Sequence, residues 1–172
     1  MNFRLKNQKS FTLMEILVYV AVLAIIVLSV STFLIWATRS NAKIKAMRET
    51  SDNARRVIEI MVYEIKEAKS IYTPTSTSTQ LSLETTHYLI SGEKTSYIDF
   101  YLCGVATICL KKESENPITL TSDRVEVNNL EFIRIATSSV QINLGINFKN
   151  PQHRPESQPT INLTSTASFR TY

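Results

Sequence analysis

The chain shows three successive patterns of apolar and polar positions. Residues 16–38 form an uncharged run in which 19 of 23 side chains are apolar. Between 47 and 72 apolar residues recur at steps of three and four, which is the spacing of one helical face. From residue 80 onward, short segments alternate between apolar and polar positions, as strands with one face on a core do. No Gly or Pro precedes Pro74, so the sequence predicts one unbroken helix through the first two patterns.

The second part of this helix is predicted to have one apolar face, which we expect to pack on a sheet. The face consists of Met47, Ala54, Ile58, Met61, Ile65, Ala68 and Tyr72. The alternative is a coiled-coil seam, for which fewer than four clean heptads are present.

The remainder is predicted to be β-rich. The hydroxyl-rich segment TPTSTST at 73–79 is typical of a flexible connector or loop. Strands are predicted over 80–84, 87–91, 96–103, 107–112, 124–136 and 139–148, with a final strand within 161–169. The fold class is therefore α+β: a long N-terminal helix that packs by its second half on an antiparallel β-sheet domain.

Composition supports a membrane segment. The 172 residues are 44% hydrophobic overall, but outside the run at 16–38 the proportion falls to about 38%, which is low for a packed soluble domain. A run of this length spans the hydrocarbon core of a bilayer as a helix. These observations exclude a simple cytosolic protein.

The net charge of +4 divides unevenly along the chain. Arg4, Lys6 and Lys9 supply +3 within the first ten residues, and the rest is nearly neutral. Basic residues at 39–48 are diluted by acids and are typical of a membrane-edge collar. Because no clustered basic face with interleaved aromatic residues follows, no direct nucleic-acid contact is predicted.

Two ordinary interpretations of the N-terminus are unsatisfactory. A secretory signal peptide has a shorter apolar core, and IWATRS at the end of this run is a poor cleavage site. A plain signal anchor explains the length and the basic head, but it leaves Glu15 unexplained, since a carboxylate at the edge of a membrane helix is costly.

Glu15 is the last residue of the segment KSFTLME at 9–15. With the basic head before it and the apolar run after it, this segment resembles the type IV pilin and pseudopilin family. That family carries a short basic leader, a small residue, and then Phe-Thr-Leu-x-Glu at the start of a long apolar helix. The resemblance implies a long helix, half in the membrane and half embedded in a β-domain.

The resemblance also implies residue roles. Prepilin peptidase would cleave between Ser10 and Phe11 and N-methylate the new Phe11 amine. Glu15 would pair with that amine on a neighbouring subunit and so set the register between subunits. An ammonium and a carboxylate attract strongly in apolar surroundings, and either one alone is penalised there. The family usually has Gly before the cut, where this chain has the equally small Ser10.

Over the whole chain the order of segments resembles the J-type minor pseudopilins of type II secretion and the W-type minor pilins of type IV pili. The implied parts are a cytoplasmic leader (1–10), the transmembrane part of the helix (11–38), its amphipathic part (39–72) and an extracytoplasmic β-rich domain (73–172). The implied partners are prepilin peptidase, other pilin or pseudopilin subunits, an inner-membrane assembly platform and the lipid bilayer. The implied location is the inner membrane, and then a pilus or pseudopilus.

Two interpretations stay open for Cys103 and Cys109, which flank a predicted turn near Gly104. They could form a disulfide in an oxidising compartment, or they could be two small buried side chains. Two Cys without a nearby His make an incomplete metal site, so no metal is predicted. Since the sequence contains no catalytic constellation and no phosphate-binding loop, we expect no enzyme and no cofactor.

Two functions from other classes remain as alternatives. The first is a single-pass, membrane-anchored extracytoplasmic binding module that does not polymerise, in which Glu15 is incidental. The second is an anchored enzyme, against which the missing constellation argues.

Overall fold

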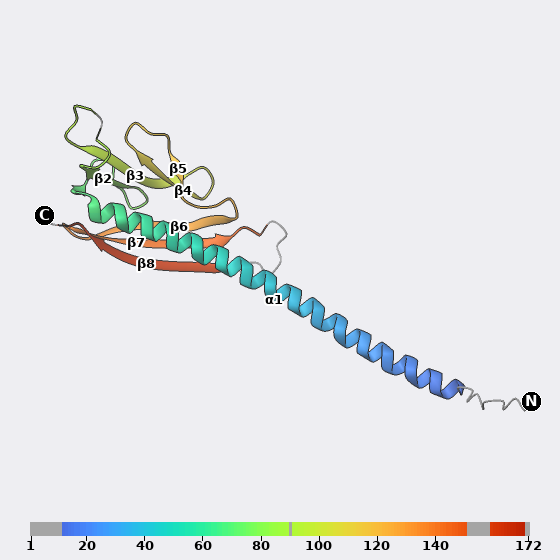
Figure 1. Cartoon of the computed structure of the whole chain (residues 1–172). Helices are drawn as coiled ribbons and strands as arrows, with labels where there is room; N and C mark the ends of the chain where they lie inside the picture. The colour runs from blue at the N-terminus through green and yellow to red at the C-terminus, as the bar shows by residue number, and fades with distance from the viewer. Residues whose placement is uncertain (1–11, 90, 151–158, 171–172) are drawn as a thin grey trace, which may run out of the picture. The chain divides into compact units, whose positions relative to one another are not determined.

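A computed structural model describes residues 12–89, 91–150 and 159–170. The chain divides into two compact units, Met1–Asn41 and Ala42–Tyr172, and the helix α1 (Leu13–Glu67) contributes to both. One long N-terminal helix followed by antiparallel strands confirms the predicted α+β class (Figure 1).

In the first unit, α1 carries the apolar run. By length and composition it is the one helix among the described residues that can cross a membrane, with a mean hydropathy of 2.8 in its most apolar window. No side chain in that window is buried within the protein. A helix of this kind satisfies its backbone groups internally, as the interior of a bilayer requires. The segment therefore fits a transmembrane helix.

Two hydroxyl groups inside the apolar run bond to the helix itself. Ser29 Oγ donates to the Ile25 carbonyl at 2.8 Å, and Thr32 Oγ1 donates to the Leu28 carbonyl at 2.9 Å. Because an unpaired polar group in hydrocarbon is costly, these bonds to the preceding turn explain why the two polar residues are tolerated there.

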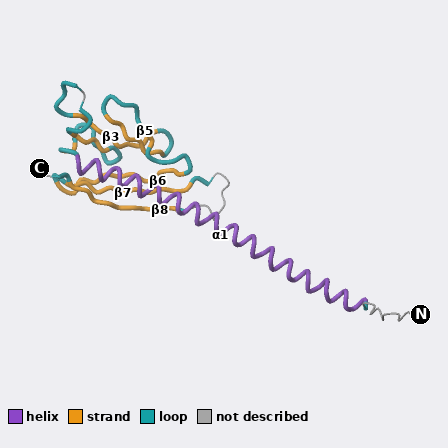
Figure 2. The backbone as a smooth tube through the Cα atoms, in the orientation of Figure 1, coloured by secondary structure: helices purple, strands orange, loops and turns teal. Residues whose placement is uncertain are grey.

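In the second unit the strands form two antiparallel sheets (Figure 2). The five-stranded sheet has the order β1-β2-β3-β4-β5, and the three-stranded sheet has the order β6-β7-β8. The strands are β1 (Ser70–Ile71), β2 (Leu81–Thr85), β3 (Ser96–Cys103), β4 (Thr107–Lys112), β5 (Ile118–Thr119), β6 (Val125–Ala136), β7 (Ser139–Phe148) and β8 (Thr160–Ser168). The sequence predicted one sheet, because period-two alternation does not show which strands share a sheet.

Most predicted strands match the observed ones, and those at 96–103, 107–112 and 139–148 agree at both ends. The strand predicted over 87–91 is wrong for the residues described there, which form bends and turns. Tyr88 has a φ of 61°, in the left-handed region that a strand does not use. The two-residue strands β1 and β5 were too short for the pattern to reveal.

The helix ends at Glu67, short of the predicted boundary at 72. After it the chain enters β1, where Ser70 pairs with Glu84 and Ile71 pairs with Leu83. The Lys69 N–H also donates to the Glu84 carbonyl at 2.8 Å. Pairing with β2 therefore ends the helix, although residues 68–72 contain no Gly or Pro that would stop it.

One core joins the helix to both sheets. In the view of Figure 1, β2–β4 lie to one side of the second part of α1, and β7 and β8 lie to the other. The buried cluster includes Met61 from the helix, Phe100 from β3 and Ile142 from β7, each fully buried. The predicted packing of the helix on sheet structure is thus present.

The buried helix face matches the predicted one at Ala54, Met61 and Ile65 and differs from it at other positions. Met47 was predicted on this face and is 49% exposed, whereas Val57 was not predicted there and is fully buried. Two polar residues, Thr50 and Asn53, are also buried on this face. Thr50 Oγ1 donates to the Ala46 carbonyl at 2.9 Å, and Asn53 Oδ1 accepts from the Ser122 N–H at 2.9 Å. Apolar periodicity alone missed these positions, because their polar groups are satisfied by hydrogen bonds.

Candidate functional site

The candidate functional site is the start of α1. Thr12 precedes the first helical residue, and its carbonyl accepts from the N–H of Glu15 at 3.1 Å and of Ile16 at 3.3 Å. Thr12 Oγ1 also accepts from the Glu15 N–H at 3.3 Å. Thr followed three residues later by Glu is the sequence of a capping box. Thr12 therefore acts as the N-cap that fixes where the helix begins.

The Glu15 carboxylate lies in the first turn of the helix and is exposed in the single chain. Tyr19 Oη, one turn later, donates to Glu15 Oε1 at 3.5 Å. No basic side chain among the described residues lies within ion-pair distance of this carboxylate. A carboxylate is favoured at the positive end of a helix dipole, and here it is also accessible to a cation from another molecule.

The other two predicted residues of this site, Ser10 and Phe11, lie outside the described residues. The structure therefore places Glu15, the cap before it and the apolar helix after it. Their relation to the predicted cleavage point follows from the sequence alone.

Residues 5–31 match a family model described as the prokaryotic N-terminal methylation motif. This match supports the resemblance of the N-terminal segment to type IV pilin-like proteins. The motif includes Ser10, Phe11 and Glu15, together with the first part of the apolar helix. The motif indicates an N-terminal segment of the prepilin type, and the apolar helix that continues from it fits a transmembrane helix. A family of this kind is typically structural. Neither the curated proteins nor the solved structures contain a match to the chain.

A polar cluster that the sequence did not reveal lies at the other end of α1. Glu64 is only 6% exposed, and Tyr88 Oη donates to its Oε1 at 3.4 Å. Lys112 Nζ lies 3.5 Å from the centre of the Tyr88 ring. Burial raises the pKa of Glu64 above its ordinary value, and the nearby Lys112 charge only partly opposes this. The sequence contained one indication of this cluster, because Glu64 lies three residues after Met61 and therefore on the same, buried face of the helix.

His87, to which the sequence gave no role, also belongs to this end of the helix. Its Nε2 lies 3.5 Å from Glu67 Oε2, and Arg170 Nη1 donates to Glu67 Oε1 at 2.9 Å. These contacts join the helix end to the segment after β2 and to the segment after β8. In the described part of the chain, no three His, Cys, Asp or Glu side chains gather in a way that could hold a metal ion.

Glu64→Gln is expected to stabilise the second unit increasingly as the pH rises. The raised pKa means that the native state holds the proton more tightly than the unfolded state does. That contribution is fully present below the unfolded pKa and is lost as the pH rises through the folded pKa, whereas glutamine remains neutral. Urea unfolding of the detergent-solubilised protein between about pH 4 and pH 8, followed by circular dichroism, measures the difference.

Glu84→Gln provides the matched control with the opposite sign. Lys69 Nζ donates to Glu84 Oε1 at 3.0 Å and Ser70 Oγ donates to Oε2 at 2.9 Å, and these bonds lower the pKa of Glu84. Its contribution is present above the unfolded pKa and is lost as the pH falls through the lowered one. The substitution should therefore destabilise at neutral pH and have little effect in acid. Parallel pH profiles for the two variants would contradict both assignments.

Cys103 and Cys109 lie at the tip of the β3–β4 hairpin. Cys103 faces Thr107 across the strands and Cys109 faces Tyr101, so the two cysteines are diagonal neighbours on one face of the sheet. Their Cα atoms are 5.8 Å apart, and the two sulfur atoms are bonded. This geometry supports the disulfide interpretation, which stays a prediction.

We expect neither cysteine of the denatured protein, purified without reductant, to react with iodoacetamide until a reductant is added. Intact-mass measurement before and after reduction counts the alkylated thiols. The Cys103→Ser/Cys109→Ser double variant is expected to lose about 2 kcal/mol of unfolding free energy, as a short closed loop implies. As a control, reductant should not change the stability of that variant. Alkylation of the unreduced wild-type protein would show free thiols.

Proposed function

We propose that this chain is the precursor of a minor pilin or pseudopilin subunit. Prepilin peptidase cleaves it between Ser10 and Phe11 and N-methylates Phe11. The mature subunit then joins a type IV pilus or a type II secretion pseudopilus, at its tip or during priming. The observation that carries the proposal is a methylation motif over residues 5–31 at the start of an apolar helix that continues into an α+β domain.

The proposal fixes an orientation in the membrane. The first ten residues carry Arg4, Lys6 and Lys9 and no acid. Because basic flanks stay on the cytoplasmic side, the leader is cytoplasmic and the β-rich domain is extracytoplasmic. The predicted disulfide is consistent with this side of the membrane, since disulfides persist in oxidising compartments.

The minor role rests on the order of segments along the chain. An amphipathic helix with the segment RRVIEIMVYEIKEAKSI is followed by the strands TQLSLET and YIDFYLC and by the long strand region after Pro117. This order resembles the J-type minor pseudopilins and the W-type minor pilins, which supports a tip or priming position.

Glu15 is the residue to which the proposal assigns assembly. Its carboxylate lies in the first turn of the helix, where the partner among the described residues is the Tyr19 hydroxyl. In a filament the surroundings of an apolar helix are the apolar helices of other subunits. A carboxylate there requires a cation, and the N-methylated Phe11 amine of a neighbour provides one.

The mature N-terminus tests the proposal. Intact-mass and peptide mass spectrometry of the membrane-extracted protein should show a chain that begins at N-methyl-Phe11. The matched control is the same gene expressed in a strain without prepilin peptidase, where only the precursor should accumulate. A stable form that retains Met1 to Ser10 in the strain with the peptidase would refute the proposal and favour the anchored binding module.

A further inference from the structure

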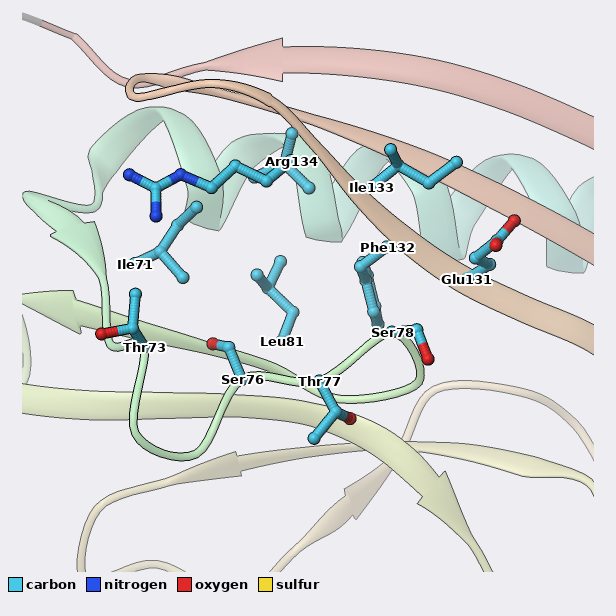
Figure 3. Close-up of a pocket in the computed structure, with 11 residues that line it drawn as sticks. Ile71, Thr73, Ser76, Thr77, Ser78, Leu81, Glu131, Phe132, Ile133 and Arg134 are labelled. Carbon is cyan, nitrogen blue, oxygen red and sulfur yellow. The ribbon is translucent and has the colours of Figure 1, made fainter.

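A cavity of about 530 Å³ lies beside β6 in the second unit. Its apolar wall includes Ile71, Leu81 and Phe132, and the loop between β1 and β2 closes one side of it (Figure 3). That loop is held by its own hydrogen bonds, since the Thr77 N–H donates to the Gln80 carbonyl at 2.8 Å. The volume lies in the range of cavities that bind ligands, and an apolar wall suits one or two apolar side chains.

The cavity adjoins an open strand edge. β6 pairs with β7 on one side, and on its other side the Phe132 N–H donates to the Ser78 carbonyl at 2.7 Å. The main-chain groups of alternate residues in an antiparallel strand point to the same side. Since the register runs unbroken from Phe132 to Arg134, the N–H of Arg134 also points away from β7. No described residue outside the sheet bonds to it.

The side chains at this edge favour a ligand with a negative charge. Arg134 is exposed, and among the described residues no carboxylate lies within ion-pair distance of it. Glu131 lies at the other end of the cavity (Figure 3), and its Oε2 accepts from Asn143 Nδ2 at 3.0 Å. Arg134 lies at the same end of the cavity as Ile71 (Figure 3). A guanidinium that has no carboxylate partner within the described ranges, and that lies beside an apolar cavity, suits a carboxylate that is close to an apolar group.

We infer that the β6 edge binds an extended segment of a partner polypeptide as an added strand. The segment pairs its main chain with Arg134, as the Ser78 carbonyl does with Phe132. It places an apolar side chain in the cavity and a carboxylate on the Arg134 guanidinium. Because side chains two positions apart lie on the same side of a strand, the segment carries an apolar residue and an acidic residue with one residue between them.

Fluorescence anisotropy with the full chain in detergent micelles tests this inference. The probe is a labelled, end-capped peptide, Thr-Val-Thr-Ile-Ser-Glu-Thr, in which Ile and Glu are two positions apart. We expect saturable binding that Arg134→Glu weakens by roughly tenfold or more, as loss of a charge-assisted bond implies. A peptide with Lys in place of Glu should bind the Arg134→Glu variant better than it binds the wild type. Lys149→Glu, a charge reversal outside the cavity, is the matched control and should leave binding unchanged.

The main-chain part of the inference has its own readout. Hydrogen exchange at the Arg134 amide should slow on addition of the peptide, and Arg134→Pro should bind more weakly than Arg134→Ala, because only the proline removes the donor. Absence of saturable binding, or equal binding by the wild type and Arg134→Glu, would overturn the inference. If instead Arg134→Glu abolishes self-association of a protein that does not bind the peptide, the occupant is a second copy and the partner proposal is wrong. None of these outcomes depends on cleavage at Ser10.

Discussion

Glu15→Ala is expected to leave membrane insertion intact and to lower incorporation into the filament by roughly a hundredfold. In the proposed assembly, the substitution leaves the Phe11 amine of a neighbouring subunit without its counter-ion in apolar surroundings. Removing one partner of a buried ion pair typically costs about 3–5 kcal/mol. Quantitative immunoblotting of sheared filaments against the membrane fraction measures the ratio of incorporated to unincorporated subunit.

The N-cap at Thr12 suggests a control that separates the charge of Glu15 from its effect on the start of the helix. Glu15→Gln keeps a side chain that suits the third position of a capping box, but it removes the charge. If the charge matters, glutamine should impair incorporation about as severely as alanine. If glutamine assembles normally and alanine does not, Glu15 acts through the start of the helix and the pairing role is wrong.

Met61→Ala is expected to lower the unfolding free energy of the second unit by about 2–5 kcal/mol. Met61 is fully buried in the core that joins the helix to both sheets, so truncation leaves a cavity and loses apolar contacts. Thermal unfolding of the detergent-solubilised protein, followed by circular dichroism of the β-rich domain, measures the loss.

Met47→Ala is the matched control, because it makes the same chemical change on the same helix. Met47 is 49% exposed in the single chain, so we expect its truncation to change stability by less than about 0.5 kcal/mol. The comparison tests which face of the helix packs on the sheets. A large effect at Met47 together with a small effect at Met61 would contradict the packing face that the structure shows.

The sequence predicted the parts of the fold that depend on local periodicity. The span at 16–38, the continuous helix and the strands at 96–103, 107–112 and 139–148 follow from spacings that each segment carries in itself. What it could not predict depends on partners far away in the chain. The division into two sheets, the end of the helix at Glu67 and the short strand β1 are set by pairing between separate segments.

The candidate site divides in a similar way. Glu15 and its surroundings could be recognised from the sequence, because the motif is contiguous and is followed at once by the apolar run. Glu64 was missed, since a lone Glu among apolar positions reads as an interruption of the face until Tyr88 and Lys112 are placed beside it. The sequence also could not predict the cavity beside β6, because a loop at 73–80 and a strand some fifty residues later form it together.

The shared core has a consequence for cooperativity. Each sheet buries its apolar face against the same helix, so neither sheet has a core of its own to retain when the other is lost. Opening events that release one sheet therefore expose the helix face on which the other depends. Amide exchange in the centre of β3 and of β7 should then occur through one global transition, and the two sheets together form a single folding unit.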